Sequence, residues 1–191
     1  MPLRRTLVAL AAAFCAAPAL AQVETYTIDS KHTFPSFEIS HLGFSTQRGR
    51  FNGTTGKIML DPTAKTGSVD VTIDAASIDT GLEALEKHMR NEDFFNVGKF
   101  PTITFKGNRM RFEGDRLVAV DGDFTMLGVT KPVTLKVDHF RCAMHPLAKK
   151  QACGADASTV IRRSEFGMTK YPAPILGEEV KIAIQIEAIR D

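Results

Sequence analysis

The sequence lacks the short motifs that mark the common enzyme active sites. It contains no Gly-x-Ser-x-Gly elbow, no His-Glu-x-x-His, no Cys-x-x-Cys, no Gly-x-Gly-x-x-Gly and no phosphate-binding loop. It also lacks an apolar run of the ~20 residues that a membrane-spanning helix needs. These absences argue against enzymes and helical membrane proteins built on those patterns. We expect no catalytic residues, no metal site and no cofactor.

An excess of one charge is lacking as well. The chain has 24 Lys and Arg against 22 Asp and Glu, and two of the positive residues, Arg4 and Arg5, lie at the N-terminus. Without those two, 24 − 2 leaves 22 positive residues against 22 negative ones, so the rest of the chain is formally neutral. Nucleic-acid binding would need a clustered basic face. We therefore predict no nucleic-acid partner.

The N-terminus has the pattern of a secretory signal peptide. Two arginines precede an apolar run over residues 7–17, and residues 19–21 supply the small side chains of a cleavage site. A retained membrane anchor is the alternative, but the run is short for a bilayer span. We predict removal of residues 1–21, which leaves residues 22–191 as a single domain.

Cysteine is scarce, with three residues in the whole chain. Cys15 belongs to the predicted leader, so Cys142 and Cys153 remain in a chain addressed to an oxidising compartment. Metal binding together with His145 is the alternative, but zinc sites usually space their cysteines two to four residues apart. We predict a disulfide between Cys142 and Cys153 that closes a long hairpin loop.

Most of the remaining chain alternates apolar and polar residues with period two, which is typical of antiparallel strands with one solvated face. A sheet of so many strands loses its free edges if it closes into a barrel, although alternation alone also fits a sandwich. We predict an all-β fold of roughly eight to ten strands, for which an antiparallel β-barrel and a sandwich both stay open at this point. The strand-like segments are residues 23–28, 37–42, 50–60, 69–74, 102–106, 109–113, 118–126, 133–138, 158–166 and 180–187.

One segment has the pattern of a helix instead. Thr80 and Glu83 have the spacing of a capping box, and Leu82, Leu85 and Met89 fall on one face at helical spacing. We predict one short helix near residues 81–90 that lies across a sheet face or covers an end of the barrel.

Four polar side chains are candidates for chemistry. His32 and His41 could approach each other on neighbouring strands and bind a metal, but the sequence indicates no third ligand. Arg162 and Arg163 are consecutive on a strand-like segment, so their side chains point to opposite faces and one faces inward. An inward arginine needs a partner, and a structural carboxylate is favoured over an oxygen of a ligand.

Several segments together resemble the YceI family of bacterial periplasmic proteins. The resemblance covers the whole chain after the leader, and it depends on the order and spacing of the segments more than on any one of them. The matching segments are residues 26–33, 37–44, 49–51, 93–95, 100–101, 127–133, 163–168 and 179–180.

The resemblance implies an extended, lipocalin-like barrel of eight antiparallel strands in the periplasm. It implies an interior that binds a long isoprenoid lipid, such as a polyprenyl chain or the tail of ubiquinone, and no established catalytic residues. It is also compatible with a homodimer. The protein would then be a binding or carrier protein and not an enzyme.

We predict that apolar side chains facing the interior form the ligand-binding site. Two alternatives stay open: a structural or interaction module with a filled core, and a lipid-acting enzyme that uses His32 or His41. The predicted lining residues are Phe37, Ile39, Phe44, Phe51, Leu85, Met89, Phe94, Phe105, Phe112, Phe124 and Ile184.

Overall fold

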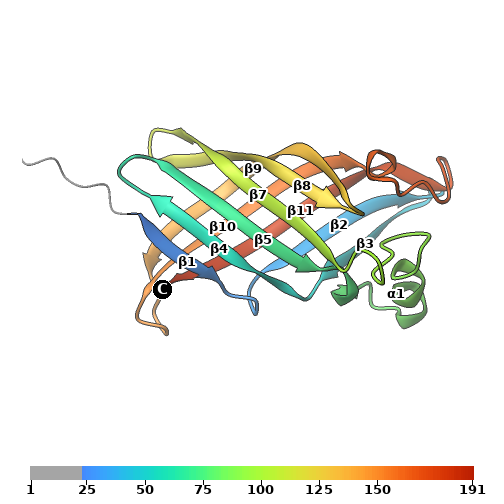
Figure 1. Cartoon of the computed structure of the whole chain (residues 1–191), viewed down its shortest axis with the longest axis horizontal. Coiled ribbons are helices and arrows are strands. Elements are labelled where there is room, and N and C mark those ends of the chain that lie inside the picture. Colours follow the sequence, from blue (N-terminus) through green and yellow to red (C-terminus); the bar gives the residue numbers. More distant parts are fainter. Residues whose placement is uncertain (1–22) are drawn as a thin grey trace, which may run out of the picture.

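The chain forms a long antiparallel β-barrel with one α-helix at one end (Figure 1). The computed structural model describes residues 23–191, so the predicted signal peptide lies outside the described residues. The elements in chain order are β1 (Glu24–Ile28), β2 (Phe34–His41), β3 (Ser45–Phe51), β4 (Thr54–Asp61), β5 (Thr66–Asp74), the 3-10 turn η1 (Ala75–Ser77), β6 (Ile78–Asp79), α1 (Glu83–Met89), β7 (Thr102–Glu113), β8 (Arg116–Met126), β9 (Val129–Met144), β10 (Gln151–Arg162), the 3-10 turn η2 (Arg163–Phe166) and β11 (Leu176–Arg190).

Eight of these strands pair side by side in a closed ring. Their spatial order is β1, β4, β5, β7, β8, β9, β10 and β11, and the pairing of β1 with β11 closes the ring. Every pairing in the ring is antiparallel. The predicted all-β barrel is confirmed, and closure removes the free edges that an open sheet would present.

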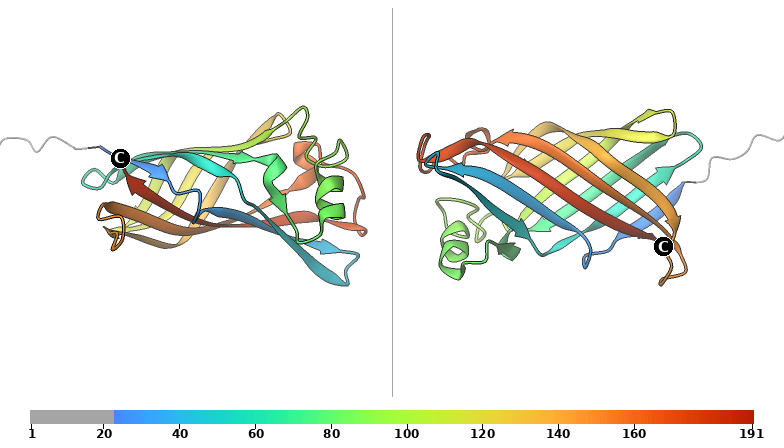
Figure 2. Two further views of the ribbon diagram at one scale, coloured as in Figure 1. Left: turned by 90° about the horizontal axis from the view of Figure 1, so that it is seen from below. Right: turned by 180° about the vertical axis from the view of Figure 1, so that it is seen from behind.

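The wall extends beyond the ring at the end that carries α1. The last part of β11, residues 188–190, pairs with β1, whereas its earlier part, residues 176–185, pairs with β2. Strand β3 pairs with the other edge of β2, and the short β6 pairs with β3. Strands β2 and β3 therefore lengthen the barrel on the α1 side, as the two views in Figure 2 show.

Alternation along the strands places one apolar face inside the barrel. On β11, Ile182, Ile184 and Ile186 are half-buried and line the interior, whereas Lys181 and Gln185 are exposed. Successive side chains of a strand point to opposite faces, and branched side chains suit the pleated surface. The sequence pattern therefore fixes which residues face inward.

Buried side chains form two groups along the barrel. The larger group includes Phe51 and Phe124 and lies toward α1, and the smaller includes Tyr26 and Leu60 at the opposite end. Half-buried side chains on the inner wall, such as Val71, contact both groups. The interior is thus predominantly apolar along its length.

Helix α1 covers part of one barrel end and falls within the predicted range 81–90. The predicted capping box between Thr80 and Glu83 is wrong, because the helix begins at Glu83, two residues later than a Thr80 cap requires, and its cap position, Leu82, has no side-chain cap. Instead, Oε1 of Glu86 accepts a hydrogen bond from the backbone N–H of Thr80 at 2.9 Å. This bond fixes the entry into the helix.

Arg90 fastens the end of the helix to the wall. Its guanidinium donates hydrogen bonds to the carbonyl oxygens of Ala76 and Ile78 at 2.8 and 3.0 Å, and it lies 3.5 Å from the Glu86 carboxylate. Helix and wall are therefore held together by polar contacts as well as by packing.

Within residues 23–191, no helix is long and apolar enough to cross a bilayer.

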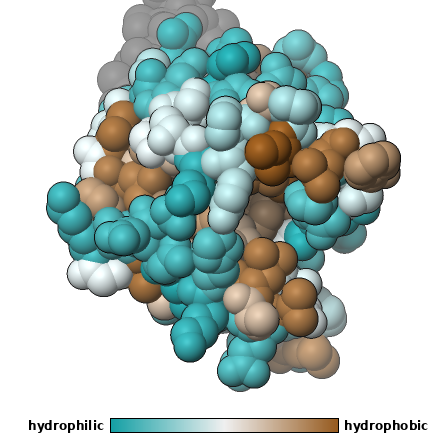
Figure 3. Space-filling view, turned by 90° about the vertical axis from the view of Figure 1, so that its right-hand side faces the viewer, coloured by the Kyte–Doolittle hydropathy of each residue, from teal (hydrophilic) through white to brown (hydrophobic). Residues whose placement is uncertain are grey.

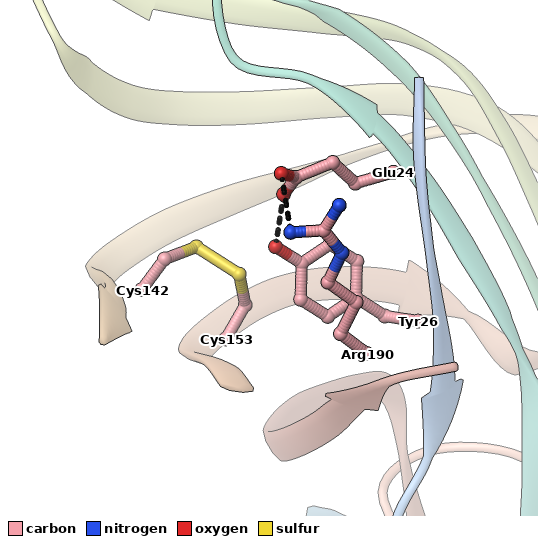
Figure 4. Close-up of a disulfide and its surroundings, with 5 residues drawn as sticks. All are labelled: Glu24, Tyr26, Cys142, Cys153 and Arg190. Carbon is pink, nitrogen blue, oxygen red and sulfur yellow. Dashed lines mark hydrogen bonds and ion pairs between the residues drawn. A yellow bond between two sulfur atoms is a disulfide. The ribbon is translucent and has the colours of Figure 1, made fainter. Parts of the chain in front are cut away.

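The predicted disulfide is confirmed at the barrel end opposite α1 (Figure 4). Cys142 on β9 and Cys153 on β10 are direct cross-strand partners, with a Cα–Cα distance of 4.1 Å. The bond closes the hairpin that contains residues 143–152, as the sequence predicts.

Candidate functional site

A cavity of about 550 Å³ lies inside the barrel. It runs from Tyr26 and Cys153 near the disulfide to His41 and Tyr171 near α1, and its wall is almost entirely aliphatic and aromatic. Protein interiors normally leave few voids larger than a water molecule. An apolar cavity of this size is instead in the range of pockets that hold small-molecule ligands.

Most of the predicted lining residues border this cavity. Strands β2, β3, β7, β8 and β11 supply inward side chains at the alternation positions, and α1 and the segment after it supply the rest. The nine predicted residues on the wall are Phe37, Ile39, Phe51, Leu85, Met89, Phe94, Phe105, Phe124 and Ile184.

Phe44 and Phe112 lie elsewhere. Phe44 is 89% exposed in the turn between β2 and β3, because Leu42 and Gly43 adopt positive φ angles of 53° and 71° and end the strand alternation before it. Phe112 packs in the core beside the turn between β7 and β8, where the strand register shifts between Arg111 and Phe112. Neither ring forms part of the cavity wall.

A polar cluster lies at the disulfide end of the cavity (Figure 4). Tyr26 is 2% exposed, and its hydroxyl donates a hydrogen bond to Oε2 of Glu24 at 2.5 Å. The other carboxylate oxygen of Glu24 lies 2.9 Å from Nη1 of Arg190. Burial, followed by the contact with Glu24, raises the pKa of Tyr26 to about 12. The phenol therefore stays neutral, and the buried side chains of Tyr26, Leu60 and Cys153 close this end.

The α1 end is the opening of the cavity, which we call the mouth. Its polar border consists of His41, Gln47, Arg48, Thr80 and His88. Figure 3 looks at this end of the molecule and shows hydrophobic surface beside a hollow. A ligand can therefore enter from this end while the opposite end stays closed.

An aromatic group lies on one side of the mouth. The ring of His88 on α1 lies 5.1 Å from the ring of Phe94 and 6.2 Å from that of Tyr171. The rings of Phe94 and Tyr171 are 6.2 Å apart. Helix α1, the segment after it and the loop before β11 thus meet at the mouth.

Arg163 is the inward arginine and borders the cavity at 1% exposure. An arginine has five N–H donors, and each donates to a backbone carbonyl oxygen within residues 168–177, at 2.6–3.3 Å. We call this segment the mouth loop. The favoured carboxylate partner is wrong, because the loop wraps its carbonyl groups around the guanidinium. Burial lowers the pKa of Arg163, and no N–H group is left for a ligand.

The other polar candidates are distributed over the surface. His32 lies outside the cavity, where Nδ1 is 2.8 Å from the Asp29 carboxylate, and this hydrogen bond raises the pKa of the imidazole. Arg162 points outward, 3.8 Å from Glu165. Of the two histidines considered for chemistry, only His41 borders the cavity. Among the described residues, no group of three His, Cys, Asp or Glu side chains could hold a metal ion.

Sequence reasoning missed some of the lining. Tyr26 alternates with Ile28 on a segment recognised as a strand, so its period-two position is a signal that could have placed it inside. Tyr171 and Ile175 also border the cavity, but they belong to the mouth loop, which has no strand or helix periodicity. Their position depends on the contacts of Arg163.

Comparisons with known proteins agree with this architecture. The family model described as YceI-like domain matches residues 26–188. A UPF0312 protein of Pseudomonas paraeruginosa is 37% identical, over 98% of this chain and 99% of its own.

Two solved structures share the fold. The crystal structure of Burkholderia cenocepacia BcnA has a TM-score of 0.73 at 23% identity, covering 84% of this chain and 98% of its own. A polyisoprenoid binding domain from Saccharophagus degradans has a TM-score of 0.66 at 16% identity, covering 87% and 98%. At these identities the likeness establishes the barrel fold alone.

Proposed function

This chain belongs to the YceI-like domain family, and we propose that it is a periplasmic binding and carrier protein for a long isoprenoid lipid. The observation that carries the proposal is the apolar cavity of about 550 Å³, which buried side chains close at the disulfide end and which opens at the mouth. A polyprenyl chain or the tail of ubiquinone would lie along the barrel, with its polar group at the mouth.

The affinity would come from burial of the tail. Each buried methylene contributes ~0.8 kcal/mol, so even part of a long tail would be held tightly without directional bonds. The wall offers few polar groups between Tyr26 at the sealed end and His41 at the mouth. The description of the Saccharophagus degradans domain as polyisoprenoid binding supports the same ligand class.

The periplasmic location is part of the proposal. The sequence pattern of the leader directs export, and the Cys142–Cys153 disulfide suits an oxidising compartment. Disulfides are rare in the reducing cytosol. Both observations support a periplasmic location.

The two alternative functions, an interaction module and a lipid-acting enzyme, require different structural features. An interaction module with a filled core does not account for an open cavity lined by Phe105, Phe124 and Ile184. A lipid-acting enzyme that uses His32 has little support, because this side chain pairs with Asp29 outside the cavity. His41 at the mouth is the residue through which an enzyme would have to act.

A binding titration tests the proposal. Delipidated protein is titrated with ubiquinone and with a polyprenol, and the variant Phe124→Asp is compared with Thr125→Asp. Phe124 is on the cavity wall, whereas the hydroxyl of Thr125 contacts Thr130 on the outer face. We expect wild type and Thr125→Asp to bind and Phe124→Asp to lose binding. A wild type that binds neither lipid contradicts the proposal, and turnover of a lipid that His41→Ala abolishes would favour the enzyme.

A further inference from the structure

Large apolar side chains are exposed around the mouth. They come from three separate segments: the turn between β2 and β3, the entry into α1, and the mouth loop. Phe44 is the most exposed of them, at 89%. We call the set the apolar rim, and its members are Leu42, Phe44, Leu82, Tyr171 and Ile175.

The rim is held by the fold. The backbone N–H of Leu42 donates a hydrogen bond to the carbonyl oxygen of Ile175 at 2.9 Å, so the β2–β3 turn and the mouth loop are joined. Tyr171 is held by Arg163 through its carbonyl oxygen and lies against the His88 ring. The β2–β3 turn and the mouth loop are therefore held together at this end of the barrel, where Figure 3 shows hydrophobic patches around a hollow.

Oppositely charged side chains near the rim form two ion pairs, and Glu83 and Lys87 on α1, one of each sign, are exposed. Nε of Arg48 lies 2.8 Å from the Glu38 carboxylate, and Nζ of Lys170 lies 3.3 Å from the Asp93 carboxylate. Each pair combines one positive and one negative charge. The attraction that the rim offers is therefore apolar, and it does not depend on a charged partner.

We propose that the apolar rim docks on the surface of a lipid bilayer, so that an isoprenoid tail passes between membrane and cavity without crossing water. The inference rests on the proposed function. A second protein molecule seated on the rim would cover the mouth and block entry. A bilayer buries the same side chains and also supplies the cargo. Tyr171 suits such a place, because tyrosine has an apolar ring and a polar tip that favour membrane interfaces.

The energetic argument concerns the transfer step. A tail that leaves the membrane through water exposes its whole apolar surface, at ~0.8 kcal/mol for each methylene. With the rim inserted into the headgroup region, the tail passes from hydrocarbon directly to the apolar wall of the cavity. The rim should therefore control the rate of transfer, whereas the wall controls the amount bound at equilibrium.

The test separates rate from equilibrium binding. Vesicles of phosphatidylcholine carrying a fluorescent prenyl probe are mixed with delipidated protein, and probe transfer is followed with time. The rim variant is Phe44→Ser with Leu82→Ser, neither of which lines the cavity. The matched control is Leu147→Ser, because Leu147 is 86% exposed in the hairpin at the opposite end.

We expect the rim variant to transfer the probe at least tenfold more slowly than wild type and to co-sediment less with vesicles. The Leu147→Ser protein should behave as wild type. All three should bind the probe equally when it is added from ethanol without vesicles. Vesicle binding should not require anionic lipid or fall at high salt.

Several outcomes would overturn the docking. These are equal transfer rates for the rim variant and wild type, vesicle binding that needs anionic lipid, or a wild-type dimer that the rim variant loses. A wild type that takes up probe from ethanol but does not associate with vesicles also overturns it and leaves the proposed function intact. Conversely, association with vesicles without uptake of probe supports the docking and contradicts the proposed function.

Discussion

Nη2 of Arg163 donates a hydrogen bond to the carbonyl oxygen of Tyr171, 2.6 Å away. This bond joins a buried charge to the residue that borders both the cavity and the apolar rim. The same guanidinium donates four further hydrogen bonds to carbonyl oxygens of the mouth loop. This one side chain therefore anchors much of the mouth loop.

Replacing Arg163 by lysine should destabilise the barrel by about 3 kcal/mol or more. Lysine keeps the charge but has three donors and no planar fork, so buried carbonyl oxygens lose their partners. Urea unfolding measures the loss, and hydrogen exchange should show faster exchange in residues 168–177. The control is Arg162→Lys, because Arg162 points outward. An equal effect of the two substitutions would contradict the anchoring role.

A bulky side chain placed inside the cavity should weaken the binding of long isoprenoid tails. Ala155 lines the cavity on β10, whereas its neighbour Asp156 is exposed. Ala155→Trp adds a large side chain to the available volume, so we expect affinity for a long polyprenol to fall at least tenfold and that for a short prenyl alcohol to fall less. Asp156→Trp should bind both as wild type does. Equal affinities for all three proteins would show that the ligand lies elsewhere.

Removing the disulfide should reduce stability without affecting the ligand site. The bond joins residues separated by 11 positions, and a closed loop of that size stabilises by about 3 kcal/mol. The double variant Cys142→Ser, Cys153→Ser should unfold at lower urea concentration and bind the same lipid with unchanged affinity. Loss of binding at a urea concentration where the variant is fully folded would assign the disulfide a direct role at the site.

Tyr26 should make the barrel sensitive to alkaline pH. Its folded pKa of about 12 lies above the ordinary value of 10.0, so its contribution to stability is complete below pH 10 and is lost between about pH 10 and 12. The free energy of unfolding should fall by about 1.4 kcal/mol for each pH unit in that interval. Urea titrations of wild type and Tyr26→Phe measure the difference. Parallel slopes for the two proteins would contradict the assignment.

Much of the barrel could be predicted from the sequence, because each strand shows its inward face locally. Alternation assigns Phe105 and Ile184 to the wall, and both lie there. Alternation misplaces Phe44, because two positive φ angles reverse the chain just before it. Period two holds only while the backbone stays extended.

Two features, the closure of the barrel and the shape of the mouth, could not be predicted from local sequence patterns. The ring closes where Tyr26 pairs with Arg190, and no local pattern indicates such a distant partner. The mouth loop carries no periodicity, and its form follows from carbonyl contacts to Arg163. The available signal is an arginine at an inward position of the segment that follows β10, and this signal favours a carboxylate partner instead.

The central claim is that the cavity holds an isoprenoid lipid in the cell. The most direct measurement is extraction of freshly purified protein, isolated without detergent, with organic solvent followed by mass spectrometry of the extract. The account predicts a long polyprenyl or prenyl-quinone compound in wild type, at close to one per barrel, and its absence from Phe124→Asp. An extract free of lipid, from a protein that also fails to bind added ubiquinone or polyprenol, would contradict it.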